Sequence, residues 1–189
     1  NQCFAVVQFV YPGTPAEKAG MKRGDLILQM NGTDITTSNY YDLFYSSSVT
    51  LGMAALNGNV ISLNNKTISL TAVSMYQEPV NTYKGINKGS SKIGYLFYTD
   101  YTLKSHEKLL EVLQSFKASG VTDVILDLRY NLGGYSLTSQ ILSSMLAPAS
   151  VVSGKQIFLK QVWNDDYMAY WKKQGEDQDE YFSYTYNYE

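Results

Sequence analysis

Gly133 and Gly134 are the residues of this 189-residue chain whose type and position best suit chemistry. They follow the apolar run at residues 124–128 and precede residues 136–146, which have the pattern of a helix. Glycines leave the backbone uncovered, so their amide N–H groups can point at an anion, and the partial positive charge of a helix start favours the same anion. Two interpretations follow: a loop that stabilises negative charge, or a tight turn from strand to helix without a chemical role.

The order of strand, glycine loop and helix also occurs at phosphate-binding sites. Here the loop has neither the Lys-Ser/Thr ending of a Walker motif nor the pattern Gly-x-Gly-x-x-Gly. A nucleotide-binding α/β protein is therefore the weaker hypothesis.

Charged and polar residues flank the glycines. Asp127 and Arg129 are two residues apart in a predicted strand, so their side chains face the same side. The run is too apolar to tolerate a lone charge. We therefore predict that Asp127 and Arg129 form a structural ion pair or hydrogen-bonded anchor that supports the loop. The same supporting role is assigned to Asn131, which lies within the loop.

No nucleophile with an activating base is evident. Ser136 and Ser139 follow the glycines, but the segment lacks the second glycine of a nucleophile elbow. The single histidine, His106, falls in the first turn of a predicted helix beside a leucine stripe, which favours a structural role. Lys155 and Lys160 fall on a predicted strand and are interpreted as solvated. Without a base, the two serines are interpreted as ordinary helix residues.

The composition excludes several classes of protein. The chain is 44% hydrophobic and 17% charged, as in an ordinary globular protein, and its net charge of -2 gives no basic surface for nucleic acid. One cysteine and one histidine exclude an internal disulfide and a Cys/His metal site. No run approaches the roughly 18 apolar residues of a membrane span, so no transmembrane segment is predicted.

The first part of the chain predicts a small β-rich module. A short helix is expected from Thr14, its N-cap, to Gly20, its end, with Glu17 completing a capping box, and Asn31-Gly32 is the strongest hairpin signal. The other expected elements there are strands at residues 4–11, 26–30, 49–51 and 66–73, a helix at 38–45 and a loop at 57–65.

The second part alternates strands and helices. The polar segment at residues 77–91, broken by turn residues, is predicted to connect the two parts. Beyond it, strands are expected at residues 93–98 and 124–128, the latter covered on both faces, helices at 105–119 and 136–146, and a tail strand at 181–188. The fold class is therefore mixed α/β, with a small β-rich module followed by a partial α/β crossover layer.

Three stretches resemble a known family. Residues 11–27, Tyr-Pro-Gly-Thr-Pro-Ala-Glu-Lys-Ala-Gly-Met-Lys-Arg-Gly-Asp-Leu-Ile, are similar to the PDZ signature of bacterial processing peptidases. Residues 125–134, Ile-Leu-Asp-Leu-Arg-Tyr-Asn-Leu-Gly-Gly, resemble the LDLRxNPGG segment of the same family's catalytic core, and residues 92–96 look like its IGYI strand. The chain thus resembles the C-terminal processing (tail-specific) serine peptidases over about residues 4–147.

The resemblance implies a domain organisation. Residues 1–78 would form an N-terminally incomplete PDZ-like module, residues 79–91 a linker, and residues 92–189 the N-terminal part of the serine peptidase core. Cut strands at such boundaries could favour a homo-oligomer or a strand-swapped dimer.

The resemblance also implies an activity. Family members are serine endopeptidases, without metal or organic cofactor, that act on the C-terminal regions of proteins or peptides outside the cytoplasm, in the periplasm, the cell envelope or the medium. By this resemblance, an amide of Gly133 or Gly134 donates to the oxyanion of the reaction. The helix with Tyr40, Leu43 and Phe44 would line the groove in which an extended peptide adds to a sheet edge.

Two features depart from the family pattern. Leu132 stands where the family has proline, and nothing in residues 147–189 resembles the family's later serine motif or its lysine. We therefore expect a fragment that lacks the nucleophile and is inactive by itself. The alternative is a non-catalytic PDZ-type peptide-binding or scaffold protein.

Overall fold

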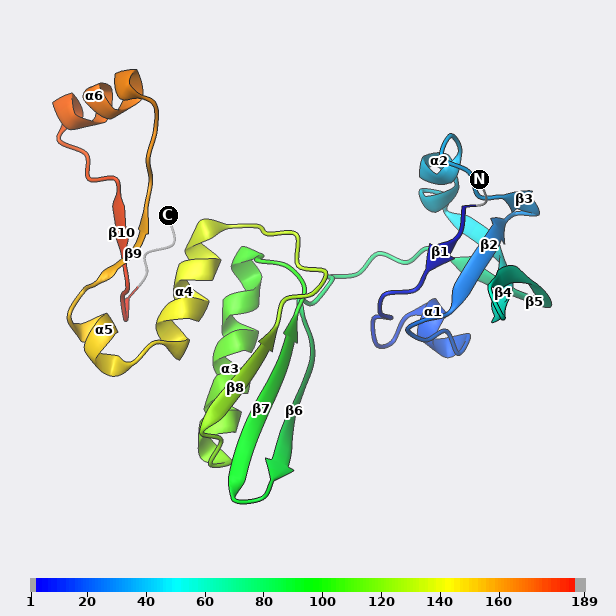
Figure 1. The fold of residues 1–189 in the computed structure, drawn as a ribbon, viewed down its shortest axis with the longest axis horizontal. Helices are drawn as coiled ribbons and strands as arrows, with labels where there is room; N and C mark the ends of the chain where they lie inside the picture. The colour runs from blue at the N-terminus through cyan, green and yellow to red at the C-terminus, as the bar shows by residue number, and fades with distance from the viewer. Residues whose placement is uncertain (1–2, 186–189) are drawn as a thin grey trace. The chain divides into compact units, whose positions relative to one another are not determined.

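A computed structural model describes residues 3–185, with only the backbone at residues 42 and 43. The chain divides into two compact units, Asn1–Gln77 (unit 1) and Glu78–Glu189 (unit 2), which Figure 1 draws from blue to teal and from green to red. Each unit has its own buried hydrophobic cluster. Each is therefore described by itself.

Unit 1 is an antiparallel sheet with two short helices. Its elements are β1 (Ala5–Val6), α1 (Pro15–Lys18), β2 (Leu26–Met30), β3 (Thr33–Asp34), α2 (Tyr40–Phe44), β4 (Ser48–Asn57) and β5 (Val60–Thr71). The strand order is β1-β2-β4-β5, and β3 pairs with β2. The buried cluster consists of apolar side chains from the sheet and from the segments beside it: Met21, Ile27, Met30, Ile35, Leu51, Met53 and Ile68.

Two local predictions for unit 1 are confirmed. Asn31 and Gly32 both have positive φ, 53° and 76°, as the tight turn between β2 and β3 requires. Thr14 caps α1, since its hydroxyl oxygen accepts a hydrogen bond from the N–H of Glu17 at 3.3 Å. The carboxylate of Glu17 accepts from the N–H of Gly13 at 2.6 Å, one residue before the cap.

Three other predictions for unit 1 are wrong. The first strand is only β1, because after Val6 the chain leaves regular pairing with β2. The predicted loop at residues 57–65 is instead the tip of the β4–β5 hairpin, whose turn needs only two residues and uses Gly58 at φ 62°. Helix α2 starts at Tyr40, since Asn39 rather than Ser38 takes the N-cap position.

Unit 2 begins with a three-stranded sheet and its helices. Its elements are β6 (Val80–Lys88), β7 (Ser91–Tyr98), the 3-10 turn η1 (Leu103–Ser105), α3 (His106–Ala118), β8 (Asp123–Asp127), α4 (Ser136–Leu146), α5 (Ala149–Ser153), β9 (Ile157–Lys160), α6 (Asp165–Gln174) and β10 (Asp179–Tyr181). β6 pairs with β7 antiparallel, and β7 pairs with β8 in parallel. Because α3 connects two parallel strands, the predicted crossover layer is present.

The prediction of a linker at residues 79–91 is wrong. Most of these residues form β6, whose side chains are mostly exposed, which explains its polar composition. Gly89, at φ 61°, makes the turn from β6 to β7. Gly85 is opposite Gly94 of β7 rather than in a loop. The irregular segment of the chain lies earlier, at residues 72–78.

The core of unit 2 lies between the sheet and the helices α3 and α4. It contains the buried residues Val80, Leu96, Tyr98, Leu109, Val112, Phe116 and Leu142. Ser105 takes the N-cap position of α3 but makes no side-chain cap hydrogen bond, because its hydroxyl hydrogen-bonds the hydroxyl of Tyr98 at 2.6 Å. β8 is not covered on both faces as predicted, since it is an edge strand with Val124 and Ile125 exposed.

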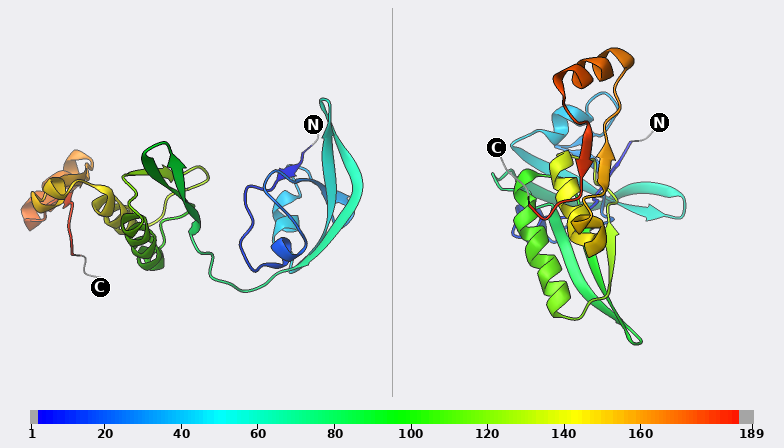
Figure 2. Two further views of the ribbon diagram at one scale, coloured as in Figure 1. Left: turned by 90° about the horizontal axis from the view of Figure 1, so that it is seen from below. Right: turned by 90° about the vertical axis from the view of Figure 1, so that its left-hand side faces the viewer.

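The last part of unit 2 is an arm, residues 157–181, made of β9, α6 and β10. β9 and β10 pair antiparallel, and Figure 2 shows these strands side by side with α6 at their end. The predicted tail strand at residues 181–188 is largely wrong, because β10 ends at Tyr181, while residues 186–189 lie outside the described part. Over residues 3–185, no helix is long and apolar enough to cross a membrane.

Candidate functional site: a glycine loop at the end of β8

The two glycines lie in the loop between β8 and the start of α4. Both have positive φ, 111° at Gly133 and 132° at Gly134, values that side chains rarely allow. An isolated parallel bridge fixes the loop: the N–H of Tyr101 donates to Gly133 O at 2.9 Å, and the N–H of Tyr135 donates to Tyr101 O at 2.8 Å. The loop is therefore tied to the segment between β7 and η1.

Gly134 is required by this bridge. A Cβ atom there would lie 2.8 Å from the carbonyl carbon of Tyr101 and 2.9 Å from its Cβ, closer than real Cβ atoms approach other heavy atoms. At Gly133, a Cβ atom would meet nothing within 4 Å. Conformation alone thus favours glycine at position 133, whereas conformation and space both require it at position 134.

Asn131 holds the loop from the inside. Its Nδ2 donates to the carbonyl of Tyr98 at 3.2 Å, and its Oδ1 accepts from the N–H of Gly133 at 2.9 Å. One of the two glycine amides is therefore already used. The N–H of Gly134 has no hydrogen-bond partner within residues 3–185, so it is the one of the two glycine amides that can be offered to a bound anion.

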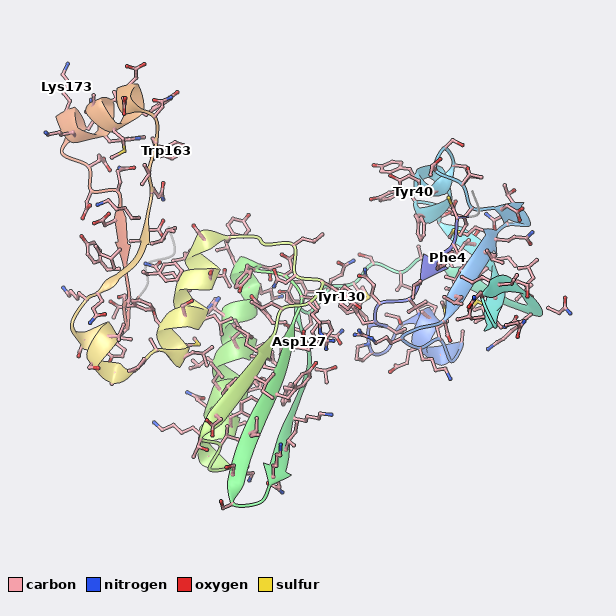
Figure 3. All side chains as sticks on the ribbon, viewed as in Figure 1. Phe4, Tyr40, Asp127, Tyr130, Trp163 and Lys173 are labelled. Carbon is pink, nitrogen blue, oxygen red and sulfur yellow. The ribbon has the colours of Figure 1, made fainter. Side chains whose placement is uncertain are left out.

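Asp127 and Arg129 form the predicted ion pair. Arg129 Nη2 donates to Asp127 Oδ2 at 2.6 Å, and Nε donates to Oδ1 at 3.0 Å, a bidentate geometry. The Arg129 N–H also donates to Oδ1 at 3.0 Å, and the Tyr95 hydroxyl donates to Oδ2 at 2.6 Å. The carboxylate is thus surrounded by donors at the base of the loop, where Figure 3 labels Asp127 near Tyr130.

These contacts change the acidity of the groups involved. Hydrogen bonds from Arg129 and then from Tyr95 hold the pKa of the Asp127 carboxyl well below its usual range. The hydrogen bond that Tyr95 donates to Asp127 raises the pKa of the Tyr95 hydroxyl, and the hydrogen bonds that Arg129 donates to Asp127 raise the pKa of the Arg129 guanidinium. Asp127 is therefore a permanent carboxylate near neutral pH and a poor general acid, which suits the supporting role predicted for it.

The other residues considered for chemistry are not brought together. His106 Nδ1 lies 2.5 Å from the carbonyl of Leu103, a local contact at the helix start. Burial raises the pKa of the Tyr101 hydroxyl, and the nearby Ser139 hydroxyl opposes this change. Ser136 is exposed, and in the described part no basic side chain hydrogen-bonds either serine. Residues 3–185 likewise contain no group of three His, Cys, Asp or Glu side chains that could hold a metal ion.

The residues of unit 1 that are predicted to bind peptide lie on α2. Tyr40 and Phe44 are each 50% exposed, while the Leu43 side chain lies outside the described residues. Unit 1 also has an apolar cavity of about 360 Å³, lined by Val7, Phe9, Val10, Tyr11, Thr14, Pro15, Ala16, Met21, Ser46, Val49, Leu70, Thr71, Ala72 and Val73. This lining includes neither Tyr40 nor Phe44.

Sequence reasoning missed two tyrosines of the site, Tyr95 and Tyr101. Tyr95 reaches Asp127 only because β7 and β8 pair in parallel with Phe97 opposite Asp127. Tyr101 contributes its backbone to the bridge with Gly134. Neither role has a local signal, since both depend on the register between segments about 30 residues apart.

Comparisons with known proteins agree with this division into units. The family model for the PDZ domain matches residues 6–52, and that for peptidase family S41 matches residues 92–177. Unit 1 is thus a PDZ module, and unit 2 contains the glycine loop within the part that matches a peptidase. The chain therefore combines a PDZ module with part of a domain of peptidase family S41.

Individual relatives name the family more closely. The chain is 28% identical over 133 residues to carboxyl-terminal-processing peptidase 2, chloroplastic, of Arabidopsis thaliana, covering 68% of this chain and 26% of that protein. It is 30% identical over 125 residues to the carboxy-terminal processing protease CtpA of Bacillus subtilis, covering 65% and 26%. A solved putative S41 protease from Bacteroides fragilis superposes with a TM-score of 0.72 at 29% identity, covering 96% of this chain and 47% of that one.

The chain belongs to the C-terminal processing peptidase family. It spans about a quarter of the length of these two curated relatives and about half of the solved structure.

Proposed function

We propose that this chain supplies the substrate-binding PDZ module and the oxyanion-stabilising loop of a serine endopeptidase that cleaves near the C-termini of proteins or peptides. The nucleophile and its base would come from outside these 189 residues. The observation that supports the proposal most is the N–H of Gly134 near the start of α4, for which residues 3–185 provide no hydrogen-bond acceptor.

The proposed chemistry requires mainly that this loop holds a backbone N–H in a fixed position. When a serine attacks a peptide carbonyl, the carbonyl oxygen becomes negative, and a backbone N–H held in place beforehand stabilises that charge. Asn131 and the Tyr101 bridge would keep Gly134 in position, and the Asp127–Arg129 pair would fix the end of the strand that carries the loop. Leu132 is fully exposed at the loop tip, so its replacement of the family's proline leaves these contacts in place.

We further propose that unit 1 binds an extended substrate segment next to α2. Its half-exposed rings, Tyr40 and Phe44, offer apolar surface for side chains of a peptide that adds to a sheet edge. Tyr40→Ser should weaken binding of a fluorescent peptide in an anisotropy titration. Tyr76→Ser, at another exposed tyrosine of unit 1, should not.

The test of the activity uses both this chain and the protein encoded by the complete natural reading frame. The complete protein should react with a fluorophosphonate probe and hydrolyse an unstructured peptide, more slowly when the peptide's C-terminal carboxylate is amidated. Residues 1–189 alone should do neither, because the covalent step needs a nucleophile. Hydrolysis by residues 1–189 would contradict the proposal.

A different outcome would favour the non-catalytic alternative. If the complete protein binds peptides through unit 1 but reacts with no fluorophosphonate, it is a PDZ-type scaffold that has kept the fold without the reaction. The two curated relatives described above are both named as processing enzymes, one of them chloroplastic, and we propose that this protein too acts outside the cytoplasm. Recovery of the complete protein in a cytoplasmic fraction would refute the location.

A further inference from the structure

The arm of unit 2 ends in a helix that buries none of its residues. α6 is well defined locally, since Asn164 accepts a hydrogen bond from the N–H of Tyr167 at 3.0 Å and Gly175 ends the helix in the left-handed conformation. Yet none of its ten residues is buried. A helix this short has only marginal stability in water without packing, so burying its exposed surface against a partner would stabilise it.

One side of α6 faces the β9–β10 hairpin. Met168, Ala169 and Trp171 line a cavity of about 390 Å³ together with residues of the hairpin such as Lys160 and Asp179. The opposite side carries Tyr167, Tyr170 and Gln174, whose spacing of three and four residues places them in one stripe. Tyr167 and Tyr170 are 56% and 50% exposed, and the ring of Trp163 lies 6.1 Å from that of Tyr167.

Charges border this aromatic stripe in a particular order. Asp166 and Lys173 are seven residues apart, so they lie within about 20° of each other around the helix and on the same edge of the stripe. Asp166 is about 6 Å before Tyr170 along the axis and Lys173 about 4.5 Å after it. Both side chains belong to exposed residues, and neither forms a salt bridge within the described residues.

This order is self-complementary. Two copies of α6 can face each other antiparallel across a twofold axis that passes beside Tyr170, perpendicular to the helix axis. Such an axis keeps the charged edge on the same side and reverses the direction along the helix, so Asp166 of one copy meets Lys173 of the other, twice. In a parallel twofold arrangement the charged edges of the two copies would lie on opposite sides of the interface, so Asp166 and Lys173 would not meet.

We propose that the stripe of Tyr167, Tyr170 and Gln174 on α6, with the neighbouring Trp163, is a homodimer interface in which a second copy of this chain packs antiparallel. The charge order favours a second copy as the partner, because the acidic and basic ends of one α6 edge complement those of an antiparallel α6. The contact of one helix pair is small, so the dimer should be weak and form in the micromolar range. This interface pairs helices and exchanges no strands.

The experiment is analytical ultracentrifugation of residues 1–189 from low micromolar to several hundred micromolar protein. The unchanged chain should shift from monomer to dimer over this range, and added salt should weaken the dimer. Tyr170→Glu should give a monomer throughout. Asp166→Lys or Lys173→Asp alone should raise the dissociation constant at least about tenfold, since attraction becomes repulsion at two symmetric places.

The charge swap and its matched control make the geometry testable. Asp166→Lys combined with Lys173→Asp should restore the original dissociation constant to within a few-fold. Asp165→Lys combined with Lys172→Asp makes the same exchange on the opposite side of the same helix, with the same loss of favourable helix-end charges, and should leave dimerisation unchanged. Circular dichroism establishes that each variant keeps its helix content.

Three results would overturn the proposal. A chain that stays monomeric at every concentration has no such interface. Dimers that are indifferent to Tyr170→Glu pair through another surface. A double swap that fails to restore the dimer, or a control swap that dissociates it equally, shows that the charges do not meet as the antiparallel arrangement requires.

Discussion

Replacing Gly134 by alanine separates the two reasons for glycine in the loop. At Gly133 and Gly134 alike, a side chain would be forced into a positive φ conformation, 111° and 132°. Only at Gly134 would the new methyl group also collide with the backbone of Tyr101. Gly133→Ala is therefore the matched control, because it adds the same atom with the same kind of backbone strain but no collision.

The expected size of each effect follows from the contacts. Backbone strain of this kind costs on the order of 1–3 kcal/mol in either variant. To accommodate a methyl group at position 134, Tyr101 must move away, which breaks its hydrogen bonds with Gly133 O and the Tyr135 N–H. Two hydrogen bonds contribute about 1 kcal/mol each, so Gly134→Ala should destabilise unit 2 by roughly 3–5 kcal/mol and Gly133→Ala by about 1–3 kcal/mol.

Urea unfolding followed by tryptophan fluorescence measures this difference. The only two tryptophans, Trp163 and Trp171, lie in unit 2, so unfolding of unit 1 contributes no tryptophan signal. If Gly134→Ala unfolds at the same urea concentration as Gly133→Ala, the bridge to Tyr101 does not constrain the loop. The N–H of Gly134 would then not be held in place before an anion binds.

Three further outcomes are expected. Gly94→Ala should destabilise unit 2 by about 1–3 kcal/mol in urea unfolding, because its Cβ would lie 2.6 Å from Cε2 of the buried Phe116 ring. Gly85→Ala on the paired strand is the control and should have no such effect, because its Cβ would meet no atom closer than 3.9 Å. Equal destabilisation by the two variants would show that contact with Phe116 is not the cause. Asp127→Asn should cost about 1–3 kcal/mol at pH 7, since it removes the carboxylate that Arg129 donates to, and an unchanged urea midpoint would refute this. Because folding lowers the pKa of Asp127, the stability that its carboxylate contributes is present above the ordinary pKa of about 3.9 and is lost as the pH falls toward the folded pKa. The difference in unfolding free energy between the unchanged chain and Asp127→Asn should therefore shrink from pH 5 to pH 2. A constant difference would show that the charge of Asp127 is not its cause.

The sequence predicted elements well where the signal was local. The Asn31-Gly32 turn and the Thr14 cap depend on the residues themselves, and both are present. Helix α4 spans Ser136–Leu146, the predicted range, because its apolar spacing and its flanking turn agree. Such features need no knowledge of the rest of the fold.

Prediction failed where exposure or pairing decided the structure. β6 is a polar edge strand, so its composition resembles that of a linker, and only its pairing with β7 makes it regular. In the site, the Asp127–Arg129 pair followed from spacing, yet the third donor, Tyr95, depended on the register between two strands. Which of the two glycine amides is available was likewise undecidable, because the answer lies in the side-chain rotamer of Asn131.

The unequal use of those two amides has a consequence for hydrogen exchange. The N–H of Gly133 is held by Asn131 Oδ1 at 2.9 Å, whereas that of Gly134 has no partner in the described part of the chain. Neighbouring backbone protons in one rigid loop should therefore exchange with deuterium at very different rates, slowly at Gly133 and quickly at Gly134. If the Gly134 N–H becomes protected only when an anionic ligand or a substrate analogue is added, that protection would report a hydrogen bond from this N–H to the negative charge of the ligand.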